Sequence, residues 1–86
     1  MLVSKAIVYY YNKLYEKSIE YNTKAIKLDS NNDAAWYWQA SCHFMLGNRQ
    51  DSISCCEKAL QLNPNNDDVK RLLKQLKGEW EVKFKD

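Results

Sequence analysis

Residues 24–33 read Lys24-Ala25-Ile26-Lys27-Leu28-Asp29-Ser30-Asn31-Asn32-Asp33, and residues 58–67 read Lys58-Ala59-Leu60-Gln61-Leu62-Asn63-Pro64-Asn65-Asn66-Asp67. The two segments align position by position at an offset of 34 residues, and the upstream pair Ser18-Ile19 matches Ser52-Ile53 at the same offset. A fixed period of this length is typical of stacked helix–turn–helix units. Such units form extended binding surfaces rather than catalytic pockets.

The length and charge of the chain limit the possible classes. Its 86 residues allow one domain, and 13 basic against 11 acidic residues give a net charge of +2. The charges are mixed along the chain, so no basic stripe indicates nucleic acid or an anionic membrane surface. The longest uncharged stretch, 34–48, is too short and too polar to span a bilayer.

The cysteine content indicates a reducing environment. Three cysteines are an odd number and do not suggest a disulfide framework. No charged-then-apolar leader with a small-residue cleavage site opens the sequence. We therefore expect an intracellular, cytoplasmic protein.

Turn-forming residues divide the sequence into five predicted helices, over about 1–12, 15–28, 33–46, 50–62 and 67–83. Segments 29–32 and 63–66 supply short oxygen-bearing side chains suited to turns and N-caps, and Pro64 blocks helix continuation. Gly47-Asn48 can adopt the left-handed backbone that ends a helix. Trp80 and Phe84 continue the apolar four-residue step of the last helix, although Gly78 disfavours that extension.

The two ends of the predicted stack differ in polarity. The last helix has an apolar face and a charged face, as the end of a stack requires, because its outer side meets water. The apolar residues are Val69, Leu72, Leu73 and Leu76, and the charged ones are Lys70, Arg71, Lys74 and Lys77. The first helix has plainly polar residues only at Ser4, Lys5 and Asn12, so we expect its outer side to be apolar. Either a preceding repeat of a longer array covers this side, or a second copy covers it, and we expect self-association through this helix.

Residues 33–66 resemble a tetratricopeptide repeat. Trp36, Ala59 and Pro64 match that family's pattern, whereas its Leu-Gly pair is Gln39-Ala40 here. Further departures are His43, Ser52 and Cys56, and the more divergent first unit places Leu2, Ala6, Tyr9, Ser18, Asn22, Ala25 and Ser30 at the pattern positions. The resemblance implies an all-α, right-handed superhelix in a single domain, with repeats at 1–32 and 33–66 and a capping helix at 67–86.

In this family the first helix of each unit lines a concave groove. The resemblance therefore predicts an aromatic and apolar groove with a polar edge, suited to an amphipathic helix or an extended apolar peptide. Its residues would be Val3, Ile7, Tyr10, Tyr11, Ala34, Tyr37, Trp38, Ser41, Met45, Arg71 and Gln75. The alternative is that Tyr37 and Trp38 only pack between repeats.

One subset of the family grips acidic C-terminal peptides of heat-shock chaperones with Lys, Asn and Arg side chains. Alignment with the first repeats of that subset places Val3, Ile7, Trp38, Asp68 and Leu72 at those positions. Alignment with its later repeats places Ala34 and Trp38 at the basic positions. None of these residues is basic or an amide, so carboxylate clamping is not expected.

The sequence offers little for catalysis or metal binding. Cys42, His43, Cys55 and Cys56 suggest zinc, but adjacent helical residues point about 100° apart, so Cys55 and Cys56 cannot easily share one ion. Buried thiols that fill helix contacts explain them better. One histidine and isolated glycines supply neither a catalytic set nor a phosphate loop. We expect no enzyme activity and no cofactor.

Two functions remain from these patterns. The favoured one is a protein-interaction module that binds a peptide or helix of a partner protein. The alternative is a structural element that forms homo-oligomers through its first helix.

Overall fold

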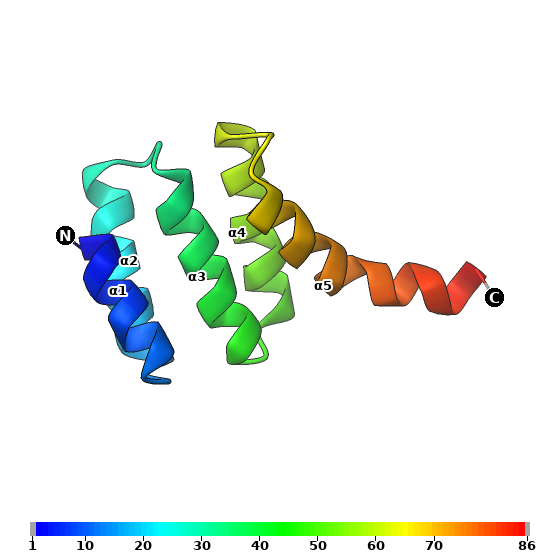
Figure 1. Cartoon of the computed structure of the whole chain (residues 1–86), viewed down its shortest axis with the longest axis horizontal. Helices are drawn as coiled ribbons and strands as arrows, with labels where there is room; N and C mark the ends of the chain where they lie inside the picture. Colours follow the sequence, from blue (N-terminus) through cyan, green and yellow to red (C-terminus); the bar gives the residue numbers. More distant parts are fainter. Residues whose placement is uncertain (1, 86) are drawn as a thin grey trace.

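The computed structural model describes the backbone of residues 2–85 and the side chains of residues 3–77. This part of the chain is all-helical (Figure 1), with helices α1 (Leu2–Tyr11), α2 (Tyr15–Leu28), α3 (Asp33–Met45), α4 (Arg49–Leu62) and α5 (Asp67–Lys85). The predicted bounds differ by no more than two residues. Helix α5 continues through Gly78, while the side chains of Trp80 and Phe84 lie outside the described residues.

Local signals end and begin the helices as expected. Asn32 caps α3, since its side-chain oxygen accepts a hydrogen bond from the backbone N–H of Ala35. Gly47 ends the α3 region with a φ of +81°, in the left-handed region that favours glycine. The equivalent turn between α1 and α2 places Lys13 there instead, at a φ of +63°. A lysine in this conformation is strained, so the first turn is less well matched to its backbone than the second.

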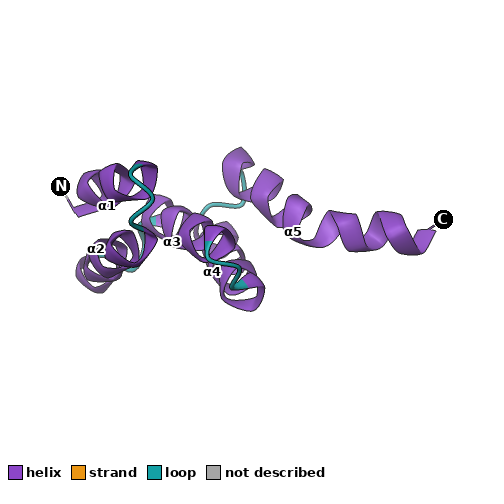
Figure 2. Cartoon of the chain, turned by 90° about the horizontal axis from the view of Figure 1, so that it is seen from below, coloured by secondary structure: helices purple, strands orange, loops and turns teal. Residues whose placement is uncertain are grey.

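The helices form two hairpins, α1–α2 and α3–α4, which lie side by side with α5 following (Figures 1 and 2). The same hydrogen bond closes each hairpin. The Ser18 hydroxyl donates to the carbonyl oxygen of Ala6 at 2.6 Å, and the Ser52 hydroxyl donates to that of Ala40 at 2.8 Å. All four side chains are small and buried, which allows the two helices of each hairpin to approach closely.

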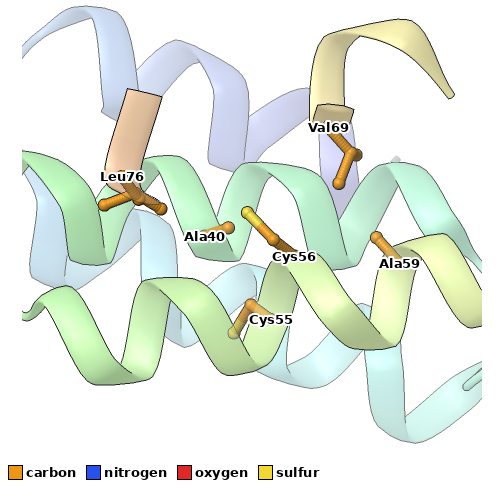
Figure 3. Packing of buried hydrophobic residues seen from close by; sticks show 6 residues of the cluster. All are labelled: Ala40, Cys55, Cys56, Ala59, Val69 and Leu76. Carbon is orange, nitrogen blue, oxygen red and sulfur yellow. The ribbon is translucent and has the colours of Figure 1, made fainter. Parts of the chain in front are cut away.

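The core of the second half is built from small and medium side chains of α3, α4 and α5. Figure 3 shows Ala40, Cys55, Cys56, Ala59, Val69 and Leu76 in this cluster. Helix α5 packs on α4 through Val69 and Leu76, and its C-terminal half extends past the hairpins (Figures 1 and 2). The fold is therefore an open, elongated stack, with principal extents of 45 × 26 × 17 Å.

The contact between the two hairpins is more polar. Gln39 of α3 donates from Nε2 to the hydroxyl of Thr23 on α2 at 3.1 Å, and the Cys42 thiol contacts the Ser18 hydroxyl at 3.1 Å. Asn22 is fully buried nearby on α2, and neither its Nδ2 nor its Oδ1 has a hydrogen-bond partner among the described residues. Unpaired buried polar atoms cost free energy, so this seam contributes less to stability than the apolar one.

Helix α1 differs from the sequence-based expectation of an apolar outer side. Ala6 is buried, and Tyr9 and Tyr10 are half-buried by ring contacts with α2 and α3. Among the side chains that the structure describes in this helix, Val8 and Tyr11 are the large apolar ones that remain exposed, while Ser4 and Lys5 give it polar surface. The expectation was too broad because it counted apolar residues without knowing which faces meet α2 and α3.

Candidate functional site

A cavity of ≈ 320 Å³ opens between α1, α3 and α5. These are the first helices of the successive units, and the 34-residue period places them on the same side of the stack. The cavity is lined by Tyr10 from α1, by Tyr37, Ser41, Phe44 and Met45 from α3, and by Asp68, Arg71, Leu72 and Gln75 from α5. We call these nine residues the concave groove.

A cluster of aromatic rings includes Tyr10 and Tyr37, which line one wall of the concave groove. The Trp38 ring packs edge-to-face against Tyr10, with ring centroids 5.3 Å apart, and against Tyr37 at 5.1 Å. Tyr11 and Tyr15 extend the cluster through contacts at 6.0 Å with Trp38 and 5.5 Å with Tyr10. Edge-to-face rings stabilise each other, so the wall is held in place before any ligand binds.

The concave groove carries no net charge. Its charged side chains, Asp68 and Arg71, form an ion pair one helical turn apart on α5. Both are exposed, so the pair adds little to stability, but it neutralises the groove edge. Burial, followed by the neighbouring Tyr15, raises the pKa of the Tyr10 hydroxyl, which is therefore neutral and able to donate a hydrogen bond at physiological pH.

The eleven residues predicted for the groove divide into two sets. Six of them line the cavity: Tyr10, Tyr37, Ser41, Met45, Arg71 and Gln75. The other five do not line it. Tyr11 and Trp38 belong to the ring cluster, Val3 and Ile7 are half-buried on α1, and Ala34 is exposed near the start of α3.

Three lining residues were not predicted for the groove: Phe44, Asp68 and Leu72. The period contained the signal, because Phe44 follows Tyr10 by 34 residues, and Asp68 and Leu72 follow Ala34 and Trp38 by the same step. In the sequence, Asp68 and Leu72 align with clamp positions, and Leu72 is also predicted on the apolar face of the last helix.

The thiols are buried within the helix contacts. Burial raises the pKa of Cys55 to about 11 and that of Cys56 to about 12. Burial also raises the pKa of Cys42, partly offset by its hydrogen bond with Ser18. In Figure 3 the side chains of Cys55 and Cys56 leave α4 in different directions. All three thiols are therefore protonated at neutral pH, and the protonated thiol is a poor nucleophile.

The sequence-based zinc alternative gains no support from the geometry. Within the part of the chain that the structure describes, no group of three or more His, Cys, Asp and Glu side chains could hold a metal ion. The Nδ1 atom of His43 instead lies 3.4 Å from the side-chain amide Nδ2 of Asn48.

A helix that crosses a membrane must be both long and apolar. None of the helices in residues 2–85 is both long enough and apolar enough to cross a bilayer.

Stacked helical hairpins with a groove along their first helices define a helical-repeat protein. The particular family follows from the comparisons with known sequences. Family models described as "Tetratricopeptide repeat" match residues 1–32 and residues 33–66. The chain belongs to the tetratricopeptide repeat (TPR) family, and the predicted all-α superhelix is confirmed.

Solved structures agree with this assignment. The second TPR domain of the human RPAP3 protein, in complex with the HSP70 peptide SGPTIEEVD, is similar with 25% sequence identity and a TM-score of 0.84. The match covers 88% of this chain and 63% of that one, so the chain spans less than two thirds of that domain. The UNC-45 chaperone, which binds and folds muscle myosin, matches with 23% identity and a TM-score of 0.84. That match covers 98% of this chain and 10% of UNC-45, and it shows likeness of fold.

Proposed function

We propose that this chain is a protein-interaction module whose concave groove binds a peptide or a short helix of a partner protein. The observation that carries the proposal is the ≈ 320 Å³ cavity, which three successive first helices line together. Tyr37, Phe44, Met45 and Leu72 offer apolar and aromatic surface there, while Ser41 and Gln75 offer polar contacts. Concave sites of mixed character, mostly apolar with a few polar groups, are typical of binding sites.

The proposed ligand is held by apolar contact rather than by a clamped carboxylate. The similar RPAP3 domain binds an acidic peptide, which supports peptide binding as the general mode for this chain. However, the one cationic side chain of the concave groove, Arg71, is already paired with Asp68. A neutral groove offers no net attraction for an acidic terminus, so its affinity should change little with ionic strength.

A pair of neighbouring residues tests the site. Met45 lines the concave groove, whereas Leu46, the next residue, is also exposed but lines a separate cavity with Leu14. Apolar peptides selected from a random library provide the probe. Met45→Ala should weaken binding of a selected peptide by about 1–2 kcal/mol, and Tyr37→Ala by about 2 kcal/mol or more, because truncated anchors lose buried contact area.

Leu46→Ala is the matched control and should leave the dissociation constant of the selected peptide unchanged. The peptide SGPTIEEVD should bind more weakly than the selected apolar peptide in isothermal titration. Tighter binding of SGPTIEEVD that depends on Arg71, or equal losses from the Met45 and Leu46 variants, would overturn the proposal.

A second candidate function is homo-oligomerisation through α1. The supporting observation is that, among the α1 side chains the structure describes, Val8 and Tyr11 are the large apolar ones that remain exposed, at 58% and 70%. Tyr9 and Tyr10 of the same helix contact rings of α2 and α3.

A further inference from the structure

A second cluster of side chains lies on the first hairpin, away from the residues of the concave groove. Tyr9 of α1 stacks on Tyr21 of α2, with ring centroids 5.4 Å apart and planes 17° from parallel. Three ammonium groups surround this pair. Lys24 and Lys5 lie 5.0 and 5.7 Å from the Tyr21 centroid, and Lys17 lies 5.8 Å from that of Tyr9. We call these five residues the lysine–tyrosine face.

The positive charge of this face is not balanced within the described residues. Lys24 is paired with Glu20 at 3.7 Å, but neither Lys5 nor Lys17 has a carboxylate partner in the described part of the chain. Each ammonium group lies over a tyrosine ring, where cation–π attraction stabilises it. A carboxylate supplied by another molecule would add an opposite charge for the two ammonium groups that have none, so its binding would be favoured here.

The second hairpin shows what kind of contact this face can make. Thirty-four residues after Lys5 and Tyr21 stand Gln39 and Cys55, both buried. Gln39 is covered by the neighbouring hairpin, where it donates to Thr23 of α2. The position of Gln39 is therefore a helix contact in the second hairpin, whereas the same position in the first hairpin is Lys5, which is exposed.

From this comparison we infer that the lysine–tyrosine face is a second docking surface, which takes an acidic helix of a partner protein. The helical form follows from the way α2 covers the equivalent position of the second hairpin. The acidic character follows from the two unpaired ammonium groups, and the tyrosine rings supply flat apolar surface beneath them. This surface is independent of the concave groove, so both could be occupied together.

The probe is an acetylated and amidated alanine-based helical peptide of about 15 residues, the length at which isolated helices form, with glutamate at every fourth position. Its binding is followed by amide NMR shifts at low and physiological ionic strength. We expect shifts concentrated in residues 4–9 and 17–24, and an affinity that falls several-fold, about threefold or more, as salt is added.

Paired variants identify the residues responsible. Lys5→Ala combined with Lys17→Ala should weaken binding of the acidic peptide by about threefold to tenfold, the range for two exposed charge contacts. Lys5→Arg combined with Lys17→Arg keeps both charges and should retain the binding. Lys70→Ala with Lys74→Ala, which removes two exposed lysines from α5, is the matched control and should change affinity less than about twofold. Met45→Ala should have no effect, which separates this surface from the concave groove.

Several outcomes would overturn the inference. One is that a peptide with lysine in place of glutamate binds as tightly as the acidic peptide. Another is that the α5 control loses as much affinity as the Lys5 and Lys17 variant. A third is that the amide NMR shifts do not fall on the first hairpin. A single-stranded oligonucleotide that shifts the same residues and binds more tightly than the acidic peptide would also replace the acidic helix as the occupant.

Discussion

Among single residues, Asn22 departs most from what its surroundings favour. It is fully buried, and its side-chain amide has no hydrogen-bond partner among the described residues. The residue 34 positions later is Cys56, also fully buried, which meets the same kind of helix contact with an apolar thiol. The repeat thus provides an internal comparison between a polar and an apolar solution for one position.

Exchanging these two residues tests the cost of the unpaired amide. Asn22→Cys should raise the free energy of unfolding by about 1–2 kcal/mol, because it removes buried polar atoms without partners. Cys56→Asn should lower it by about 1–3 kcal/mol for the converse reason. Urea unfolding of both variants measures the effect. A loss of stability in Asn22→Cys would show that the amide is satisfied in the folded protein.

At the scale of elements, the two hairpin turns have the same shape but different residues. Lys13 adopts a φ of +63° where Gly47 adopts +81°. Lys13→Gly should therefore raise the free energy of unfolding by about 0.5–1 kcal/mol, since glycine reaches this conformation without the steric cost of a side chain. A Cβ added at Gly47 meets no atom within 4 Å, but the residue must adopt a positive φ, so Gly47→Lys should lower the free energy of unfolding. Thermal unfolding measures both variants. A lower stability of Lys13→Gly, or a higher stability of Gly47→Lys, would contradict the backbone explanation.

The start of α3 is tied to the turn before α5. Asp33 accepts hydrogen bonds on Oδ2 from the side-chain amides of Asn63 at 3.1 Å and Asn66 at 2.9 Å. These bonds join segments about one repeat apart, so they fix the start of α3 against the turn that leads into α5. Asp67 stands at the same helix position one repeat later and is exposed.

Asp33→Ala should lower the free energy of unfolding by about 1–3 kcal/mol, because it removes charge-assisted hydrogen bonds and leaves two amides without this partner. Asp67→Ala is the matched control. It removes the same favourable charge from a helix N-terminus, an effect of about 0.3–1 kcal/mol. The difference between the variants in urea unfolding isolates the loop contacts. Equal losses would assign the role of Asp33 to helix charge alone.

For the whole molecule, we predict that copies associate through the exposed apolar surface of α1. Val8 is 58% exposed, and Lys5 stands one turn before it on the same helix. We expect self-association at high concentration, strengthened by added salt because salt screens the repulsion between lysines of two copies. Val8→Lys should weaken the association by about tenfold or more, as charge is placed in an apolar contact. Sedimentation equilibrium provides the measurement.

Leu28→Lys is the control for this experiment. Leu28 is 80% exposed and ends α2, so it tests whether any exposed apolar residue has the same effect. A protein that remains monomeric at high concentration, or equal losses from both variants, would remove α1 as the association surface.

Much of the groove was predictable because the groove repeats with the chain. Tyr37, Ser41 and Met45 share one helical face, and Arg71 and Gln75 follow Tyr37 and Ser41 by 34 residues. Trp38 packs against Tyr10 and Tyr37 and does not itself line the cavity, a difference that helical spacing alone does not reveal. Whether the lining residues bind a peptide remains a prediction.

The sequence by itself determined the helices, their turns and the period, because caps, glycine conformation and apolar spacing act over a few residues. Only the tertiary structure decided which side of α1 is covered, that Asn22 is buried without partners, and that three lysines gather around Tyr9 and Tyr21. These features depend on how helices meet across the stack. A linear pattern records which residues share a face, but the packing between helices decides what that face contacts.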